Sequence, residues 1–266
     1  MLVDTHCHLE MLGDGQEVEE IILRAREASL IFMVTIGTDF ASSEKSCELT
    51  RQYNDVFATV GVHPHEVKTI GSDIFDKFRD LIERHPKIRG IGETGLDFYY
   101  DHSPRETQKS AFVNHIRLAK ERALPLVIHS RNAPKETIDI LKKEKAEKVG
   151  GIIHCFTENL EMALAAIELN FLISFSGIIT FNNSSSLREV VSQIPLDKIL
   201  IETDSPFLSP VPFRGKKNEP MRVKHVAEKI AEIKKVPVEK IMSQTTENAK
   251  RIYGLSSFSG ESSGTT

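Results

Sequence analysis

The residues of this sequence best suited to chemistry are histidines and carboxylates that directly follow short apolar runs. Two carboxylates, Glu93 and Asp204, are placed in this way. Imidazole and carboxylate groups are common ligands of divalent metal ions, so their recurrence at one kind of position predicts a metal site. The histidines that end an apolar run, six of the ten in the chain, are His6, His8, His63, His65, His129 and His154.

The motif His6-Cys7-His8 places two imidazoles one residue apart. Side chains alternate between the two faces of a strand, so His6 and His8 share a face and can bind one ion, while Cys7 points away. Alone, the motif is a weak signal, and two polar residues in a surface turn are its more common meaning. Asp4 lies on the same face one layer deeper, where it can orient a ligand histidine or satisfy backbone groups.

Glu93 follows the apolar run 88–91, where a carboxylate is costly to bury without a partner. That partner can be one metal ion, two ions that share the carboxylate, or an arginine. Asp204 ends the last apolar run, and it would lie beside His6 and His8 if the last strand pairs with the first. Glu202 falls on the same face but deeper, and we interpret it as structural.

His129 and His154 each follow an apolar run, on consecutive predicted strands and at the same depth. One such histidine alone is more often a hydrogen-bonded structural residue. The pair together indicates metal ligands. Arg131 shares a face with His129 and is a candidate for binding an anionic group of a substrate, the alternative being an ion pair with Glu93 or Asp97.

These residues need a scaffold that brings the carboxyl ends of many strands to one rim. Short β-rich apolar runs alternate with longer segments of helical period, which indicates βα units and a parallel sheet. Eight repeats in 266 residues favour an α/β fold of the (β/α)8 TIM-barrel type over an open doubly wound sheet. The predicted strands are 2–5, 31–36, 56–62, 88–92, 126–128, 151–153, 171–175 and 198–203.

The ends of some elements are marked in the sequence. Ser103, followed by a proline and then by Glu106, predicts a capping box at the start of a helix. The last helix is expected over about 237–253. Beyond it the chain is polar and rich in glycine and serine. We therefore predict one barrel domain, 1–255, with an extra C-terminal helix and a disordered tail, 256–266.

The composition is that of an ordinary globular protein, with 40% hydrophobic and 27% charged residues. The net charge of −4 argues against a general nucleic-acid coat protein. No apolar run is long enough to span a bilayer, and the N-terminus lacks a signal-peptide pattern. Cys7, Cys47 and Cys155 form no CxxC motif, so we expect reduced thiols and a cytoplasmic location. No obligate protein partner is evident.

The candidate ligands are too numerous for one four- or five-coordinate ion. Two divalent ions roughly 3.5–4 Å apart would use them all, with Glu93 as the bridge. Zn²⁺, Mn²⁺, Fe²⁺ and Ni²⁺ suit these ligands, and Mg²⁺ suits them less well. Asp204 can also take a proton from an attacking water, so Glu93 and Asp204 are the candidate catalytic residues for hydrolysis of a P–O, C–O or C–N bond. One ion would be held by His6, His8 and Asp204, and the other by His129 and His154.

Other residues near the predicted rim are candidates for substrate contact. Arg214 and Lys216 lie in the loop 212–220, which follows the last predicted strand and can attract phosphates or be an ordinary solvated loop. His63 and His65 end the third predicted strand and can contact the substrate or transfer a proton. The aromatic residues that can stack on bases or pack the rim are Phe98, Tyr99 and Tyr100.

Seven segments together resemble the TatD-family deoxyribonucleases, a branch of the amidohydrolase-like metal hydrolases. The likeness extends from Leu2 to about Leu255. In the wider superfamily a carboxylated lysine often bridges the two ions, whereas this sequence has Glu93 at that place, as TatD proteins do. The segments are VDTHCH (3–8), VGVHPH (60–65), IGETGLD (91–97), HSR (129–131), IHCF (153–156), ETDSP (202–206) and RGKKNEP (214–220).

This resemblance implies a metal-dependent deoxyribonuclease, a 3′→5′ exonuclease on single-stranded DNA that is usually described with Mg²⁺. It also leaves open a D-aminoacyl-tRNA deacylase or another ester or amide hydrolase, because fold and metals do not choose the substrate. A barrel that binds a ligand without catalysis is a third alternative. The metal ligands that the family pattern implies are His6, His8, Glu93, His129, His154 and Asp204.

Overall fold

The computed structural model describes residues 1–258 and shows in them one sheet of eight parallel strands in sequence order. Each strand pairs with the next one along the chain, which confirms the predicted TIM barrel. The strands are β1 Leu2–Cys7, β2 Leu30–Ile36, β3 Val56–Val60, β4 Ile88–Asp97, β5 Leu126–Arg131, β6 Gly151–Ile153, β7 Phe171–Phe175 and β8 Ile199–Ile201.

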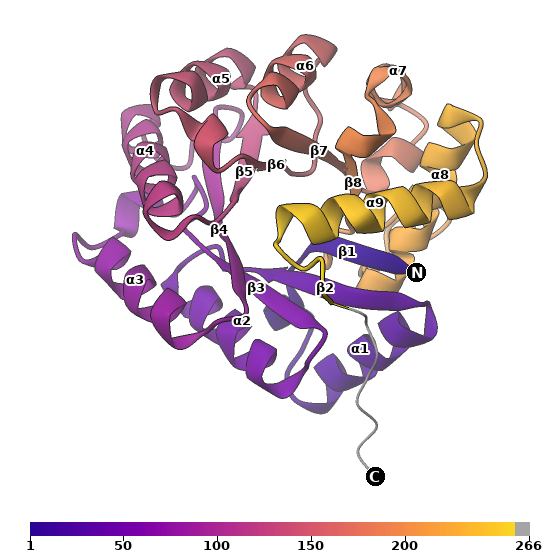
Figure 1. Cartoon of the computed structure of the whole chain (residues 1–266), viewed down its shortest axis with the longest axis horizontal. Coiled ribbons are helices and arrows are strands. Elements are labelled where there is room, and N and C mark those ends of the chain that lie inside the picture. The colour runs from indigo at the N-terminus through magenta and orange to yellow at the C-terminus, as the bar shows by residue number, and fades with distance from the viewer. Residues whose placement is uncertain (259–266) are drawn as a thin grey trace.

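Within residues 1–258, seven α-helices alternate with the strands and two more follow β8. Figure 1 shows α1 to α7 around the outside of the barrel and α9 across one end of it, beside β1. None of the helices in this part of the chain combines the length and the apolar character needed to cross a membrane. The helices are α1 Gln16–Glu27, α2 Phe40–Gln52, α3 Ile74–Arg84, α4 Arg105–Arg122, α5 Pro134–Lys143, α6 Leu160–Glu168, α7 Ser185–Gln193, α8 Val223–Lys234 and α9 Val238–Ile252.

The last strand returns to the first, as expected from the sequence. Cys7 and Ser205 form a parallel bridge just beyond β8. The backbone N–H of His8 donates to the carbonyl of Ser205 at 2.8 Å, and the N–H of Asp204 donates to the carbonyl of His6 at 2.9 Å. This nearly closed barrel brings the end of β8 beside the two histidines of β1.

Strict alternation along β1 does not hold. The pairing of β1 with β2 shifts register between Asp4 and Cys7. Val3 lies in the apolar cluster inside the barrel, whereas Cys7 packs with the larger apolar cluster between strands and helices. The expectation that Asp4 and His6 simply share a face is therefore wrong, because a local irregularity re-aims the side chains between these two positions.

The end of the barrel opposite the predicted site is closed by α9 and the residues after it. Tyr253 is buried in the cluster inside the barrel, and its hydroxyl donates to the carbonyl of Thr5 at 3.0 Å. Phe258 packs edge-on against Phe32 and Phe57, with ring centroids 5.9 and 5.4 Å away. Ordered packing thus continues to Phe258, past the expected start of the tail at 256, and 259–266 lie outside the described residues.

The predicted capping box at Ser103 is wrong. Helix α4 begins at Arg105, and its N-cap Pro104 has no side-chain hydrogen bond to give. The hydroxyl of Ser103 instead donates to the carbonyl of His65 at 2.7 Å and accepts the N–H of Lys68 at 3.3 Å. Ser103 forms these tertiary hydrogen bonds instead of the local helix cap. It therefore fixes the loop after β3, where His63 and His65 lie.

Candidate metal centre

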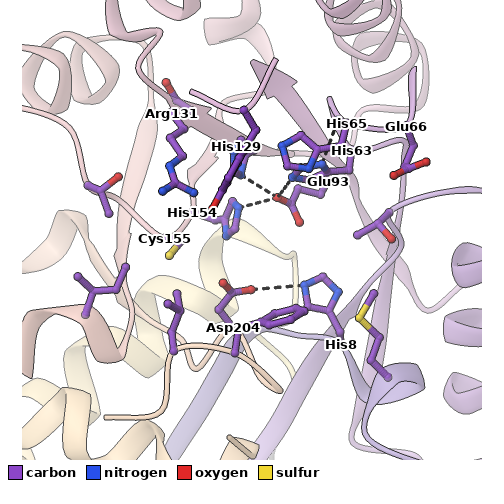
Figure 2. Close-up of a pocket in the computed structure, with 18 residues that line it drawn as sticks. His8, His63, His65, Glu66, Glu93, His129, Arg131, His154, Cys155 and Asp204 are labelled. Atoms are coloured by element: carbon purple, nitrogen blue, oxygen red, sulfur yellow. Dashed lines mark hydrogen bonds and ion pairs between the residues drawn. The ribbon is translucent and has the colours of Figure 1, made fainter. Parts of the chain in front are cut away.

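The six side chains expected to bind metal converge at the carboxyl end of the barrel. Five of them line one cavity of about 670 Å³, and His6 lies fully buried next to them. Figure 2 shows Glu93, His129 and His154 pointing toward one another across the top of the cavity, with His8 and Asp204 facing them from below. The residues that line the cavity are His8, Glu93, His129, His154 and Asp204.

Five strands supply these donors. His6 belongs to β1 and His8 follows it, Glu93 belongs to β4 and His129 to β5, while His154 and Asp204 follow β6 and β8. Asp204 adopts the left-handed backbone region at φ 54°, which aspartate tolerates better than most residues.

The strands β4 and β5 approach very closely at this level of the barrel. A Cβ atom placed on Gly95 would lie 2.0 Å from the carbonyl oxygen of His129, and Gly95 itself has φ 135°. Any larger residue would push the two strands apart. Gly95 therefore sets the depth at which His129 faces Glu93.

Glu93 uses both carboxylate oxygens toward histidines. Its Oε1 lies 2.8 Å from Nε2 of His154, 3.1 Å from Nδ1 of His129 and 3.3 Å from Nε2 of His63. Its Oε2 lies 3.4 Å from Nε2 of His6. Burial alone would raise the pKa of Glu93, but the surrounding imidazoles lower that pKa well below its usual value. Glu93 thus occupies the centre of the cluster as an ionised bridge.

Asp204 completes the other side of the cluster. Its Oδ1 lies 3.4 Å from Nε2 of His8 and 3.6 Å from Nε2 of His6. Burial of His8 opposes its charge, yet Asp204 and Glu10 raise its pKa to about 10. The pKa of Asp204 is lowered although burial raises it, because His8, His6 and His154 surround it. Without an ion, this pair therefore holds a proton that a bound metal would displace.

Three of the histidines are held in the orientation that a metal ligand needs. Nδ1 of His8 lies 3.3 Å from the carbonyl of Ile36, and Nδ1 of His154 lies 3.3 Å from Oε1 of Glu202. Nε2 of His129 lies 3.1 Å from Oδ2 of Asp97. Each acceptor takes the N–H of that nitrogen, so the other nitrogen faces the cluster. The surrounding carboxylates raise the pKa of His8, His129 and His154 although burial opposes this, so without an ion the inner nitrogens hold protons that a bound metal would displace.

His6 supplies the strongest sign that a partner belongs in the site. It is fully buried, and neither ring nitrogen forms a hydrogen bond in residues 1–258. Burial lowers the pKa of His6, so the ring is neutral and carries a lone pair. Buried polar atoms are nearly always paired. A divalent ion between His6, His8 and Glu93, whose ligand atoms lie within 4.8 Å of one another, would satisfy this ring. The residues present therefore fit a metal ion.

His63 differs from the other histidines around Glu93. Its Nδ1 accepts the backbone N–H of His65 at 3.1 Å, so the proton of the neutral ring is on Nε2, which faces Glu93. Burial lowers the pKa of His63 to about 4, which keeps the ring neutral. His63 therefore presents a hydrogen-bond donor to the cluster rather than a lone pair. Its contact with Glu93 was not anticipated from the sequence, although its place at a strand end marked it.

Asp97 is a positioning residue that the sequence did not single out. Its Oδ2 lies 2.9 Å from Nε2 of His65 and 3.1 Å from Nε2 of His129, and it is fully buried. Its Oδ1 accepts the backbone N–H groups of Tyr99 and Tyr100. The available signal was spacing, because Asp97 follows Glu93 by four residues on one strand and so shares its face.

Two deeper carboxylates accept backbone N–H groups: Glu202, which we interpreted as structural from the sequence, and Asp4, for which the sequence left two roles open. Oε1 of Glu202 accepts the N–H of Cys155 at 2.7 Å as well as contacting His154. Asp4 accepts the N–H of Thr203 at 2.9 Å and that of His6 at 3.3 Å. Asp4 thus satisfies backbone groups and orients no ring, and burial raises its pKa to about 8.

The residues expected to contact substrate divide into two groups. His63, His65 and Arg131 line the cavity. Arg214 and Lys216 do not line it, and the guanidinium of Arg214 lies 3.7 Å from the ring centroid of Phe181 in the loop after β7. Contact of Arg214 or Lys216 with a substrate stays a prediction. Within residues 1–258 Arg131 forms no ion pair with Glu93 or Asp97, so that alternative is wrong.

With the site defined, comparison with known proteins identifies the family. The family described as TatD related DNase matches residues 3–254. The chain belongs to this family. It is 45% identical over 255 residues to the uncharacterized metal-dependent hydrolase YabD of Bacillus subtilis, which covers 96% of this chain and 100% of that protein. It is 38% identical over 257 residues to the uncharacterized metal-dependent hydrolase YcfH of Escherichia coli K12, with 96% of each chain covered.

Solved structures agree with this placement among TatD proteins. The TatD homologue YjjV of Escherichia coli K12 superposes with a TM-score of 0.90 at 26% identity, covering 95% of this chain and 98% of that one. A TatD-family hydrolase of Entamoeba histolytica gives a TM-score of 0.85 at 20% identity over 96% and 98% of the two chains, which supports the fold. The chain is thus a metal-dependent hydrolase of the TatD family.

Proposed function

We propose that this TatD-family hydrolase is a deoxyribonuclease that removes nucleotides from the 3′ end of single-stranded DNA with two divalent metal ions. The observation that carries the proposal is the bridging position of Glu93, which has His129 and His154 on one oxygen and His6 on the other. A carboxylate shared in this way suits two ions. The family description supports DNA as the substrate.

The proposed ligands divide into two sets, one on each side of Glu93. His6, His8 and Asp204 would hold one ion, His129 and His154 the other, and Glu93 both. Ions bound there would polarise the phosphodiester and make water more acidic. Zn²⁺, Mn²⁺, Ni²⁺ and Mg²⁺ are the candidates, and the mixed imidazole and carboxylate ligands favour the first three.

The residues of the chain itself can hold and move the protons of hydrolysis. Oδ1 of Asp204 faces His6 and His8, while its Oδ2 makes no contact of this kind in residues 1–258. The lowered pKa keeps Asp204 ionised at neutral pH, so Oδ2 can accept a proton from the attacking water. The Nε2–H of His63 points into the same cavity and can donate to an oxygen of the substrate.

The setting of the enzyme is proposed from its thiols. Cys7, Cys47 and Cys155 are all free. Free cysteines of this kind are usual in a reducing compartment. We therefore propose a cytoplasmic location for the enzyme.

The proposal is tested with matched substrates on protein of measured metal content. A single-stranded oligonucleotide labelled at its 5′ end should give a ladder of products shortened from the 3′ end, lost with chelator and with Asp204→Ala. Metal-dependent cleavage of a D-aminoacyl-tRNA ester without DNA cleavage would overturn the nuclease and establish a deacylase. Retention of DNA without turnover at any metal concentration would instead indicate a binding protein.

A further inference from the structure

Tyr99, Tyr100 and Arg131 lie together at the edge of the cavity, and we call this group the clamp. The guanidinium carbon of Arg131 lies 4.2 Å from the ring centroid of Tyr99 and 4.6 Å from that of Tyr100. The two rings meet edge to face at 4.8 Å and 87°. A guanidinium held by two rings loses little freedom when it binds a ligand.

The clamp is built on the same supports as the candidate metal ligands. Arg131 pairs with Asp97 across β4 and β5, and its carbonyl accepts the N–H of Phe98 at 2.9 Å. Asp97 also accepts the N–H groups of both tyrosines, while its other oxygen contacts His129. One buried carboxylate thus fixes the position of the clamp relative to a proposed metal ligand.

Arg131 is the single lysine or arginine that lines the cavity in residues 1–258, and its guanidinium forms no ion pair or hydrogen bond there. Figure 2 shows its side chain extending into the cavity from the side of His129, with Glu66 on the opposite side. The aromatic rings attract the cation but leave its N–H groups unpaired. Such a fork fits the oxygens of a phosphate.

The tyrosines add a second kind of contact. Tyr99 is 57% exposed and Tyr100 is 49% exposed, although both lie beside a buried site. The ring of Tyr100 is stacked on His102 at 5.4 Å and 4°, which orients it. Tyr100 already has Arg131 over its ring and His102 stacked on it, so Tyr99 is the ring that can take a base. An exposed aromatic ring next to a cation is the arrangement that binds single-stranded nucleic acid by stacking on a base.

We propose that the clamp of Tyr99, Tyr100 and Arg131 binds a nucleotide unit next to the bond that is cleaved, with Arg131 on its phosphate and Tyr99 on its base. This inference rests on the proposed function, because it requires a nucleic-acid strand in the cavity. It assigns to this strand a binding subsite that is separate from the metal ligands. A substrate without a second phosphate and base would not use the clamp.

The test measures binding in chelator, where no hydrolysis takes place. Fluorescence anisotropy with a labelled DNA hexamer gives the Kd of the whole protein and of its variants. Arg131→Met keeps an unbranched side chain against the rings and should weaken binding at least tenfold. Arg105→Ala is the matched control, because Arg105 lies 4.4 Å from the ring centroid of Phe98 but does not line the cavity. It should change the Kd less than twofold.

A second probe separates the two contacts. A hexamer of abasic sites has the phosphates without the bases. Arg131→Met should weaken binding of both hexamers by a similar factor, whereas Tyr99→Ala should weaken binding of the hexamer with bases more than that of the abasic one. Thermal unfolding of each variant checks that it is folded.

Each remaining result has a clear meaning. Equal effects of Arg131→Met and Arg105→Ala would overturn the clamp, since only general charge would then be involved. If every variant binds the hexamer as tightly as the wild type does and DNA is still cleaved, the clamp is overturned but the proposed nuclease activity is not. Wild-type protein that binds neither hexamer and cleaves no DNA would overturn both.

Discussion

His129 and His63 approach the same Oε1 atom of Glu93, at 3.1 and 3.3 Å, but their outer nitrogens have opposite kinds of hydrogen-bond partner. Asp97 accepts the outer N–H of His129, whereas the backbone N–H of His65 occupies the outer nitrogen of His63. Once a bound metal displaces the proton between His129 and Glu93, the inner nitrogen of His129 carries a lone pair, whereas that of His63 stays a donor. Two rings at similar distances are thus expected to play different parts, one as a metal ligand and one as a hydrogen-bond donor.

Replacement of each ring tests this difference. After dialysis against one metal, His129→Asn should hold clearly less metal than the wild type by mass spectrometry. His63→Ala should hold as much as the wild type, but kcat on DNA should fall about 100- to 1,000-fold, because alanine has no side-chain donor. Equal metal loss in the two variants would show that His63 is itself a ligand and that the hydrogen bond from His65 does not fix its tautomer.

Loss of a proposed catalytic carboxylate should affect turnover far more than loss of a surface one. Asp204→Asn should lower kcat about 100- to 10,000-fold, because the amide can neither accept a proton nor bind an ion as a carboxylate does. Asp76→Asn is the control, since the side chain of Asp76 is 79% exposed and far from the cavity lining. Initial rates on labelled DNA decide the matter, and similar rates for both variants would contradict the role of Asp204.

Glu202 should act through His154 rather than on the substrate. Its Oε1 lies 3.3 Å from Nδ1 of His154 and orients that ring. Glu202→Gln should weaken metal affinity about 10- to 100-fold, and excess metal should restore most of kcat. Glu66→Gln, at the same cavity, should leave metal affinity unchanged because the side chain of Glu66 contacts none of the proposed ligands. A kcat that excess metal fails to restore would point to a direct catalytic part instead.

Metal removal should destabilise the fold, because an ion that binds only the folded state stabilises it by about 2.7 kcal/mol at 100 times its Kd. Chelator should therefore lower the Tm of the wild type in scanning calorimetry. His6→Ala should show a smaller drop, since His6 is a proposed ligand whose ring nitrogens lack other partners in the described chain. An identical drop in the variant would place the stabilising ion somewhere else.

The site was predictable from the sequence where it depends on strand ends. Parallel strands of a barrel end at one rim, so residues after apolar runs, such as His129 and His154, had to come together. The pairing of the first and last strands also followed from barrel closure, and it placed Asp204 beside His8. These inferences need only the order and direction of the strands.

The remaining features depend on hydrogen bonds that the order of strands does not determine. The tautomer of His63 is set by one backbone N–H, and the re-aiming of Asp4 by a register shift within β1. Ser103 lost its expected cap because the carbonyl of His65 is a tertiary partner. Each of these groups has alternative hydrogen-bond partners of similar energy, and the local sequence does not show which partner it takes in the fold.

The stability of the fold around the loop that carries His63 should depend on pH, because a buried histidine of α4 contacts this loop. Nε2 of His115 accepts the N–H of Val62 at 3.0 Å, and its Nδ1 donates to the carbonyl of Ala111 at 2.7 Å. Phe75 and Phe78 pack around the ring. Burial lowers the pKa of His115 to about 4. Protonation of Nε2 would put a donor against the N–H of Val62, so the folded state favours the neutral ring.

The sign of the effect follows from this lowered pKa. Between pH 6.5 and 4 the unfolded chain binds a proton that the folded chain excludes, so the free energy of unfolding falls as the pH falls through this range. The loss from this group is about 3 kcal/mol over the whole interval. His115→Gln can keep both hydrogen bonds but does not titrate. Urea unfolding in chelator should therefore show a shallower loss of stability in His115→Gln than in the wild type. Parallel pH profiles would mean that His115 already titrates normally in the folded protein, and that its contact with Val62 opens easily.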